Sequence, residues 1–297
     1  MTHSNNRVLL TGGRGFTGFY VGQSLMDAGF EVFQLTLEAV GVSDVCGNLL
    51  DKDSLNKAVN EVKPDYVIHL AAIAFVGHAS QIDFYAVNVE GTLNLLEAVR
   101  QNAPDIKKII LASSANIYGN PPVESVSENV APAPLNHYAM SKLAMEMLSR
   151  TIFNDLPIIY TRPFNYTGVG QSVDFLVPKI VEHFKNKADV IYLGNLDVVR
   201  EFNDVRAVAQ CYTELLLQTT NDGQVVNLCS GQGYKLIDLI QYCQSITGHE
   251  IRVEVNPKFV RPNELKVLIG NPSLLRTLAP NVNFMPIEET LNWMLSK

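Results

Sequence analysis

The chain has 297 residues, 47% of them hydrophobic, and a net charge of −7. This length and apolar content suffice for one large α/β domain or two smaller ones with a sizeable core. The acidic balance and the lack of a long basic run argue against a dedicated nucleic-acid surface, and no apolar stretch approaches the roughly 20 residues that span a membrane.

The N-terminal segment and the metal-binding residue types indicate a cytoplasmic protein without a metal site. The chain starts with polar residues that do not resemble a signal peptide. The cysteines are scattered, as is usual for buried free thiols in a reducing compartment. The histidines form no pair with the spacing of metal ligands, so we expect no metal.

A glycine-rich turn follows the first predicted strand. The apolar run 7–11 predicts a buried strand, and the apolar spacing of 18–28 predicts a helix. Three glycines separate them as G-x-x-G-x-x-G, whereas the usual fingerprint is G-x-G-x-x-G. Such a turn lets the backbone approach a pyrophosphate while a helix N-terminus faces its charge. The predicted dinucleotide site begins with Gly12, Arg14, Gly15, Phe16 and Gly18.

The second predicted strand, 31–36, bears on the choice of cofactor. Sites for NAD usually place an acidic residue at this strand end to bind the ribose 2′-hydroxyl. Here the strand ends in Leu35 and Thr36, although Glu38 lies close enough to reach the ribose. Arg14 in the glycine turn is suited to a 2′-phosphate, or it is simply a solvated loop charge. We therefore predict NADP(H), with NAD as the alternative.

Strands and helices then alternate. Further strands are predicted at 65–71, 107–113, 157–161 and 224–228, and further helices at 51–62, 82–102 and 138–152. This alternation predicts an α/β fold with a doubly wound parallel (Rossmann) sheet. We expect 1–165 plus 204–228 to form the dinucleotide-binding domain. Residues 166–203 plus 229–297 would form a smaller lobe over the carboxyl edge of the sheet, where ligands bind.

Two positions on the helix 138–152 suggest acid–base chemistry. Tyr138 and Lys142 are four residues apart, so they share one helix face. An ammonium beside a phenol lowers the tyrosine pKa from its usual value of about 10 and suits it to proton exchange. Alone the pair is weak evidence, because Tyr and Lys often meet on an exposed helix. Asn88 is a polar residue within the apolar helix 82–102, and we expect it to make a structural hydrogen bond.

Several motifs occur in one order along nearly the whole chain. They are the glycine turn, His69-Leu70-Ala71-Ala72, Asn88 with Gly91-Thr92, the run 113–119, Tyr138-x-x-x-Lys142 and Arg162-Pro163-Phe164-Asn165. As a set they resemble the extended short-chain dehydrogenase/reductase family that acts on nucleotide sugars. The resemblance implies that Ser114 polarises the substrate oxygen, Tyr138 exchanges its proton, and Lys142 holds the nicotinamide ribose and lowers the tyrosine pKa. The remaining cofactor contacts that it implies are Asn48, Leu49, Leu70, Ala71, Ala72, Asn88 and Pro163.

Departures from the family pattern narrow the expected chemistry. Members that dehydrate hexoses carry an Asp-Glu pair directly after the catalytic hydroxyl residue, and here those positions are Ala115 and Asn116. Members resembling GDP-fucose synthase carry a Cys at the position of Asn116. What remains is hydride transfer at the ring alone, either a ketone reduction or a 4-epimerisation through a transient ketone.

Strings in the second half of the chain resemble reductases of GDP-6-deoxy-4-keto-D-mannose. They lie at 164–171, 194–206, 227–231 and 261–264. A nucleoside diphosphate on an acidic protein needs local cations, and guanidinium groups bind phosphate oxygens bidentately. The expected substrate contacts, besides Ser114, are therefore Asn165, Lys179, Arg200, Arg261 and Glu264, although either arginine can also be read as a surface ion pair. Tyr166 stands where these reductases have His, and Val169 replaces a common Pro, which leaves the sugar open between a heptose and a hexose.

The expected function is NAD(P)H-dependent reduction of the 4-keto group of a GDP-4-keto-6-deoxy sugar, with a product of the GDP-6-deoxy-D-mannose (rhamnose) type. The first alternative is a nucleotide-sugar 4-epimerase with tightly bound NAD. The second is a nucleotide-binding regulatory protein on the same fold, since a fold does not fix a function. We also expect a homodimer formed through the helices 82–102 and 138–152.

Overall fold

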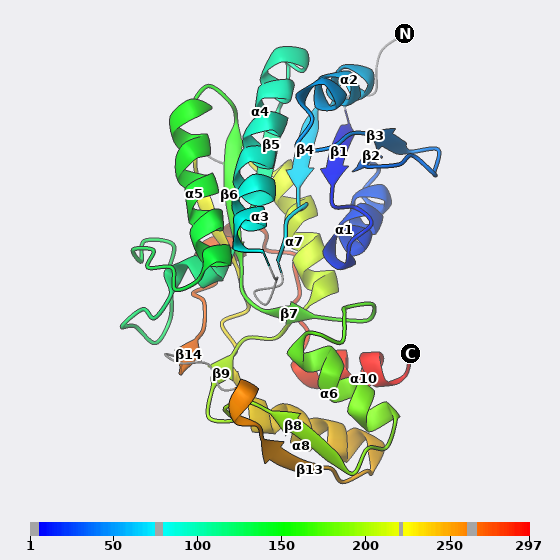
Figure 1. Ribbon diagram of the computed structural model, residues 1–297, viewed down its shortest axis with the longest axis vertical. Helices are drawn as coiled ribbons and strands as arrows, with labels where there is room; N and C mark the ends of the chain where they lie inside the picture. The colour runs from blue at the N-terminus through cyan, green and yellow to red at the C-terminus, as the bar shows by residue number, and fades with distance from the viewer. Residues whose placement is uncertain (1–5, 75–79, 220–221, 260–265) are drawn as a thin grey trace.

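A computed structural model describes residues 6–74, 80–219, 222–259 and 266–297. Within these residues a parallel sheet has the strand order β11-β6-β5-β4-β1-β2-β3 (Figure 1). The chain runs outward from β1 through β2 and β3 on one side, and through β4 and its successors on the other. Ligands bind at such a reversal, beyond the carboxyl ends of the strands. The strands are Arg7–Thr11 (β1), Glu31–Thr36 (β2), Asp44–Cys46 (β3), Tyr66–His69 (β4), Lys108–Ala112 (β5), Ile158–Pro163 (β6) and Val225–Leu228 (β11).

Helices cover both faces of the sheet, as the alternation predicted. Successive side chains of a strand point to opposite faces. Leu9 and Ile109 therefore join one apolar layer, and Val8 and Leu10 join the other. The helices over the first layer are Lys52–Val62 (α2), Gly91–Asn102 (α4) and His137–Ile152 (α5), and those over the second are Phe16–Asp27 (α1) and Val205–Leu217 (α7). The doubly wound parallel sheet expected from the sequence is confirmed.

The helix predicted at 82–102 is broken into three parts. An α-helix, Gln81–Tyr85 (α3), continues as a π-helical turn, Ala86–Glu90 (η1), and then as α4. The π turn contains Asn88, whose side chain bonds to Ile73 and Ser141. Such turns often lie at functional sites.

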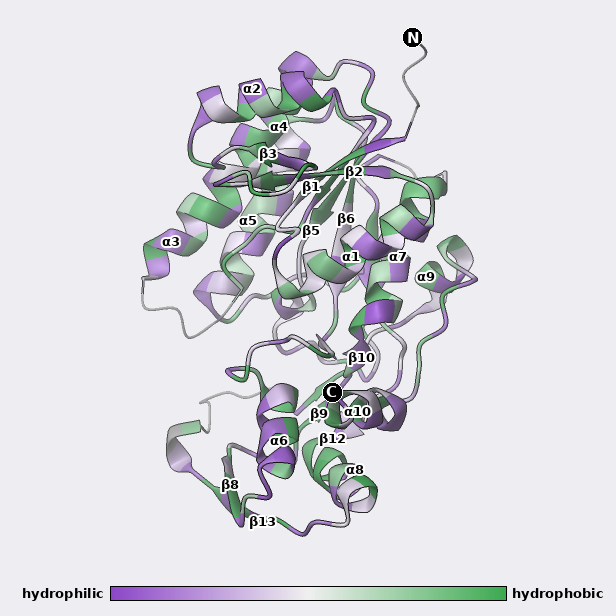
Figure 2. Ribbon diagram, turned by 90° about the vertical axis from the view of Figure 1, so that its right-hand side faces the viewer, coloured by the Kyte–Doolittle hydropathy of each residue, from purple (hydrophilic) through white to green (hydrophobic). Residues whose placement is uncertain are grey.

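A second apolar core lies beyond the carboxyl ends of the strands, toward which the strand arrows point (Figure 1). It is formed where Val181, Ile191, Leu239 and Leu291 meet. Its helices are Leu176–Lys185 (α6), Leu236–Thr247 (α8) and Ile287–Leu295 (α10), beside the paired strands Val190–Leu193 (β8) and Arg252–Val255 (β13). In Figure 2 these helices and strands stand apart from the sheet, at the opposite end from α2.

Short elements join the two parts. The pairs are Tyr166–Thr167 (β7) with Asn203–Asp204 (β10), and Val199–Arg200 (β9) with Tyr234–Lys235 (β12) and Val267–Leu268 (β14). The remaining helices are Ala115–Tyr118 (η2), Pro257–Phe259 (η3) and Ser273–Leu278 (α9). The segment 204–228 returns to the sheet as α7 and β11, as expected. Of the described helices, none is both long and apolar enough to cross a bilayer.

Candidate active site

The glycine turn lies against the end of β4. Gly12 has a φ of +72°, and a Cβ there would lie 2.8 Å from the backbone nitrogen of Ala71. A Cβ on Gly18 would lie 2.1 Å from the Gly12 carbonyl oxygen, so a side chain is excluded. Within the described residues no side chain caps α1 at Gly15, which leaves its N-terminus suited to an anion. The structure therefore brings together the turn and the Leu70–Ala72 segment that were predicted to hold the dinucleotide.

A buried histidine ties the turn to the neighbouring strands. His69 Nδ1 lies 2.7 Å from Thr11 Oγ1, which accepts a bond from the Ala71 N–H, and His69 Nε2 lies 2.8 Å from Thr92 Oγ1. Thr92 in turn donates to the Asn88 carbonyl, so Nε2 carries the ring proton and Nδ1 accepts from Thr11. Burial, aided by Lys142, lowers the pKa of His69 to about 3, so the ring is neutral at physiological pH. The sequence indicated His69 only as part of the motif His69-Leu70-Ala71-Ala72, and not its hydrogen bonds.

Asn88 makes the structural hydrogen bonds that were expected of it. Its amide oxygen accepts from the Ile73 N–H at 2.8 Å, and its amide nitrogen donates to the Ile73 carbonyl at 3.1 Å. The same nitrogen donates to Ser141 Oγ at 3.0 Å, and Ser141 donates to the Tyr138 carbonyl. The side chain thus joins the segment after β4 to the helix α5.

The predicted catalytic trio comes together at the end of β5. Ser114 follows the strand and caps η2, where its Oγ accepts from the Asn116 N–H at 3.2 Å. Its hydroxyl also bonds to that of Tyr138. Lys142 lies one turn further along α5 and donates to the Ala112 carbonyl at 2.7 Å. All three side chains belong to buried residues.

The charges of the trio differ from expectation. Burial raises the pKa of Tyr138 to about 12, against the opposing effect of the Ser114 hydrogen bond. Burial also lowers the pKa of Lys142 to about 8, although Glu146 acts in the opposite direction. The predicted lowering of the tyrosine pKa by Lys142 is therefore not observed. The physical reason is that removing the phenol from water penalises its ionised form more than its neighbours stabilise that form.

Arg14 has a partner that the sequence did not reveal. Its guanidinium pairs with the carboxylate of Asp44 on β3. Backbone hydrogen bonds from Gly41 and then Val40 lower the pKa of Asp44, with a smaller contribution from Arg14. Because β3 is only three residues long, its pairing beside β2 was not predicted. Arg14 is thus held at the edge of the sheet beyond β2.

The other predicted cofactor residues lie after the strands of the sheet. Asn48 and Leu49 follow β3, and the Leu49 carbonyl accepts a bond from Asn94 of α4 at 3.0 Å. Pro163 ends β6, beside Leu228 of β11. Phe16 begins α1, where its ring stacks on Tyr166 at a centroid distance of 6.1 Å.

The predicted substrate residues are spread between the two parts of the molecule. Asn165 is exposed after β6, and its carbonyl accepts from the Asn203 N–H at 2.9 Å. Arg200 of β9 donates to the Lys266 carbonyl at 3.3 Å. Lys179 of α6 donates to the Tyr192 carbonyl at 2.8 Å and lies 4.4 Å from the centre of the Phe259 ring. Arg261 and Glu264 lie outside the described residues.

The structure gives two residues contacts that the sequence did not predict. The Tyr166 hydroxyl lies 2.8 Å from Thr17 Oγ1, so the beginning of the lobe is tied to the glycine-turn helix. Glu201 is fully buried and accepts from the Gly270 N–H at 2.6 Å and the Ser230 N–H at 2.8 Å. Burial raises the pKa of Glu201 despite these bonds. Its position directly after Arg200 was the available sequence signal.

Comparisons with known proteins identify relatives over nearly the whole chain. The model of the NAD dependent epimerase/dehydratase family matches residues 8–229. The GDP-6-deoxy-D-talose 4-dehydrogenase of Aggregatibacter actinomycetemcomitans is 35% identical over 97% of this chain and 96% of that protein. The UDP-glucose 4-epimerase of Halalkalibacterium halodurans is 27% identical over 96% of this chain and 95% of its own.

Solved structures give the same result. A Burkholderia cenocepacia J2315 protein is 41% identical, with a TM-score of 0.91 over 98% of this chain and 97% of that one. RMD from Pseudomonas aeruginosa, solved with NADPH, is 30% identical, with a TM-score of 0.86 over 98% of each chain. The family match covers most of the chain, and the relatives span its full length. The protein is therefore an enzyme of the NAD dependent epimerase/dehydratase family.

Proposed function

We propose that this enzyme uses NADPH to reduce the 4-keto group of a GDP-4-keto-6-deoxy sugar. One observation carries the proposal: the Tyr138 hydroxyl is buried beside Ser114, and burial keeps it protonated. A protonated phenol is the form that can donate a proton to a new alkoxide. An epimerase needs the phenolate for its first, oxidative step and the phenol for its second, reductive step. The two positions where dehydratases carry an Asp-Glu pair are Ala115 and Asn116, and neither side chain is an acid.

Each member of the trio then has a role. The Ser114 hydroxyl donates a hydrogen bond to the ketone oxygen and stabilises the charge that develops on it. Tyr138 gives its proton to the same oxygen. Lys142, seated against the Ala112 carbonyl, binds the nicotinamide ribose. NADPH, when bound, supplies the hydride.

The preference for NADPH rests on charge near the end of β2. Thr36 ends this strand, and its hydroxyl donates to the Glu38 carbonyl at 3.0 Å. Thr36, whose hydroxyl is bonded to the backbone, does not supply the carboxylate that recognises a ribose 2′-hydroxyl. Arg14 is held in the turn by Asp44 and would meet a 2′-phosphate with its remaining N–H groups.

The GDP-linked substrate is proposed from the relatives. The curated dehydrogenase at 35% identity acts, by its name, on GDP-6-deoxy-D-talose. We propose that residues 166–203 plus 229–297 bind the sugar nucleotide, and 1–165 plus 204–228 bind the dinucleotide. Asn165, Arg200 and Lys179 are the described candidates for hydroxyl and phosphate contacts, to which Arg261 and Glu264 would be added.

A 4-epimerase with tightly held NAD is the second candidate. The likeness to a UDP-glucose 4-epimerase over nearly the whole chain supports it. An epimerase retains its cofactor through purification, because hydride removed from the sugar must return to it. A reductase consumes NADPH in proportion to product.

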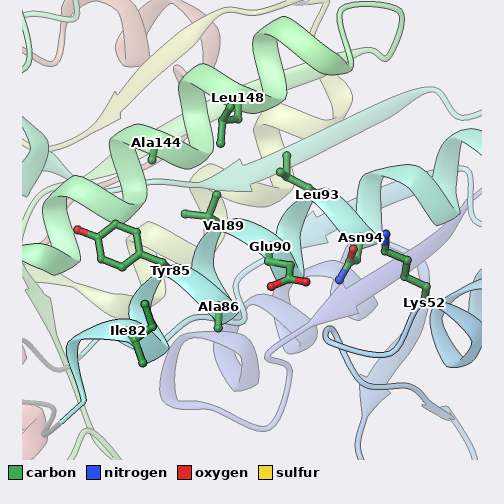
Figure 3. A pocket seen from close by; sticks show the side chains of 10 residues that line it. All are labelled: Lys52, Ile82, Tyr85, Ala86, Val89, Glu90, Leu93, Asn94, Ala144 and Leu148. Carbon is green, nitrogen blue, oxygen red and sulfur yellow. The ribbon is translucent and has the colours of Figure 1, made fainter.

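We also propose a homodimer in the cytoplasm. A hollow of about 570 Å³ lies between α3, α4 and α5, with apolar side chains on its walls (Figure 3). Leu148 lines it and is 40% exposed, and the neighbouring Met147 is 59% exposed. A second copy of these helices would cover this apolar surface. The four cysteines are unpaired; three are buried as expected, whereas Cys46 is exposed. Free thiols are typical of a reducing compartment.

The proposal is tested by NADPH consumption with a panel of sugar nucleotides. We expect consumption with a GDP-4-keto-6-deoxy sugar, abolished in Tyr138→Phe. Tyr66→Phe is the matched control, because Tyr66 begins β4 and so lies at the amino ends of the strands, opposite the carboxyl ends where the trio lies. Consumption that survives in Tyr138→Phe would remove the tyrosine from its assigned role. Release of NAD on denaturation, without NADPH consumption, would favour the epimerase.

A further inference from the structure

A buried ion pair lies one helical turn from the catalytic lysine. Glu146 follows Lys142 by four residues on α5, so the two side chains share a helix face. Arg162 of β6 donates to both carboxylate oxygens of Glu146, from Nε at 3.0 Å and from Nη2 at 2.7 Å. Both partners are almost inaccessible to solvent. A bidentate, buried pair of this kind fixes the carboxylate in position.

The arginine is itself held from a third side. Its Nη1 donates to the Tyr118 hydroxyl at 2.9 Å, and its guanidinium carbon lies 5.0 Å from the centre of the Tyr118 ring. Tyr118 then donates to the Asn227 amide oxygen of β11 at 2.7 Å. The chain of contacts spans α5, β6, η2 and β11, and Glu146 within it is 1% exposed.

Lys142 needs such a neighbour because it is itself buried. Its residue is 3% exposed, and its ammonium donates to the Ala112 carbonyl. An ammonium removed from water is costly unless an opposite charge compensates it. Glu146 is the group that favours the charged form of Lys142 against this cost.

The other ionisable groups near Lys142 do not replace Glu146. His69 of β4 lies close enough to Lys142 for the lysine charge to lower the His69 pKa. Its ring is neutral and does not compensate the ammonium. Tyr138 on α5 stays protonated at neutral pH. Arg162 is a cation, and its charge is opposed by the same carboxylate.

We propose that Glu146, held in place by Arg162 and Tyr118, is a positioning residue that keeps Lys142 charged and seated against the Ala112 carbonyl. The inference rests on the proposed function, because that function gives Lys142 its role at the nicotinamide ribose. Without the carboxylate, the buried ammonium would release its proton at lower pH, and the ribose would lose a charged donor.

The test is a titration of Lys142 by NMR in protein carrying ¹³C at the lysine ε carbon. The resonance is assigned as the one missing from Lys142→Met. In Glu146→Gln we expect the pKa of Lys142 to fall by about 1, the lower end of the effect of a nearby opposite charge, because Arg162 already neutralises part of the carboxylate. Glu97→Gln is the control, since it changes a half-exposed carboxylate on α4 that pairs with Arg100.

Folding is monitored by circular dichroism. If Glu146→Gln is unfolded, the double variant with Arg162→Gln is titrated instead, because it removes the buried guanidinium together with the carboxylate that pairs with it. A Lys142 pKa that stays at its native value in the folded variant overturns the inference. A lowered Lys142 pKa in Glu146→Gln would sustain the inference. If the unsubstituted enzyme turned over no sugar nucleotide, the proposed function would be overturned, so the two failures are distinct.

Discussion

Two glycines of α1 offer a matched test of the cofactor site. Gly18 and Gly22 are both buried and one turn apart. A Cβ on Gly22 would meet Leu10 Cδ2 at 3.6 Å, an ordinary contact. A Cβ on Gly18 would lie 2.1 Å from the Gly12 carbonyl oxygen and 2.6 Å from the Gly13 Cα, both backbone atoms that cannot rotate away. The same change, Gly to Ala, should therefore have opposite effects.

The magnitudes follow from two competing contributions. Alanine is better than glycine in a helix interior by about 1 kcal/mol, so Gly22→Ala should raise the free energy of unfolding by roughly that amount. Gly18→Ala has the same gain, but overpacking costs about 1–3 kcal/mol because the turn must move. Its stability should fall below that of Gly22→Ala by about 1–3 kcal/mol.

The displaced turn should also weaken NADPH binding by at least about tenfold, which corresponds to 1.4 kcal/mol. Urea unfolding gives the stabilities, and the fluorescence of bound NADPH gives the affinities. If Gly18→Ala matched Gly22→Ala in both stability and affinity, the close approach of helix and turn would not be what positions the cofactor.

Three further predictions concern His69, Arg14 and Leu148. The pKa of His69 is about 3 in the folded protein, which is below the unfolded value. Its contribution to the free energy of unfolding is therefore complete above the unfolded pKa and is lost as the pH falls. Between about pH 8 and pH 5 this should cost about 2 kcal/mol in urea unfolding, and His69→Asn should show a correspondingly weaker pH dependence; equal dependence would refute it. Arg14→Gln should weaken NADPH about tenfold but spare NADH, and equal weakening would deny the 2′-phosphate contact. Leu148→Asp should yield a monomer by analytical ultracentrifugation, whereas an unchanged mass would place the interface elsewhere.

The strands of the main sheet and the helices that cover it could be predicted because their apolar patterns are long and regular. The strand 31–36 and the helix end at Val62 were placed to the residue. The π turn that contains Asn88 was not predicted, and the Asn88 side chain bonds to Ile73 and Ser141, which are distant in sequence. Strands of two or three residues, such as β3, carry too little pattern to be recognised.

The residues of the candidate site could also be predicted in part, whereas their charges and partners could not. Ser114, Tyr138 and Lys142 could be named from motifs, and the structure brings them together. Their charges could not be read from spacing, because burial raises the pKa of Tyr138 against the opposing effect of the Ser114 hydrogen bond. The partners of the charged residues were equally hidden. Glu146 and Arg162 are 16 residues apart, and only the packing of α5 on β6 brings them together.

The most direct test of the central claim is the fate of the hydride. The enzyme would be incubated with a GDP-4-keto-6-deoxy sugar and NADPH deuterated at the transferable position. Reduction predicts one deuterium at carbon 4 of the product for each NADPH consumed. The reduced GDP-6-deoxy sugar would be incubated separately, without added NADPH. Interconversion of its 4-epimers, together with no deuterium uptake by the 4-keto sugar, would contradict the reduction and identify an epimerase.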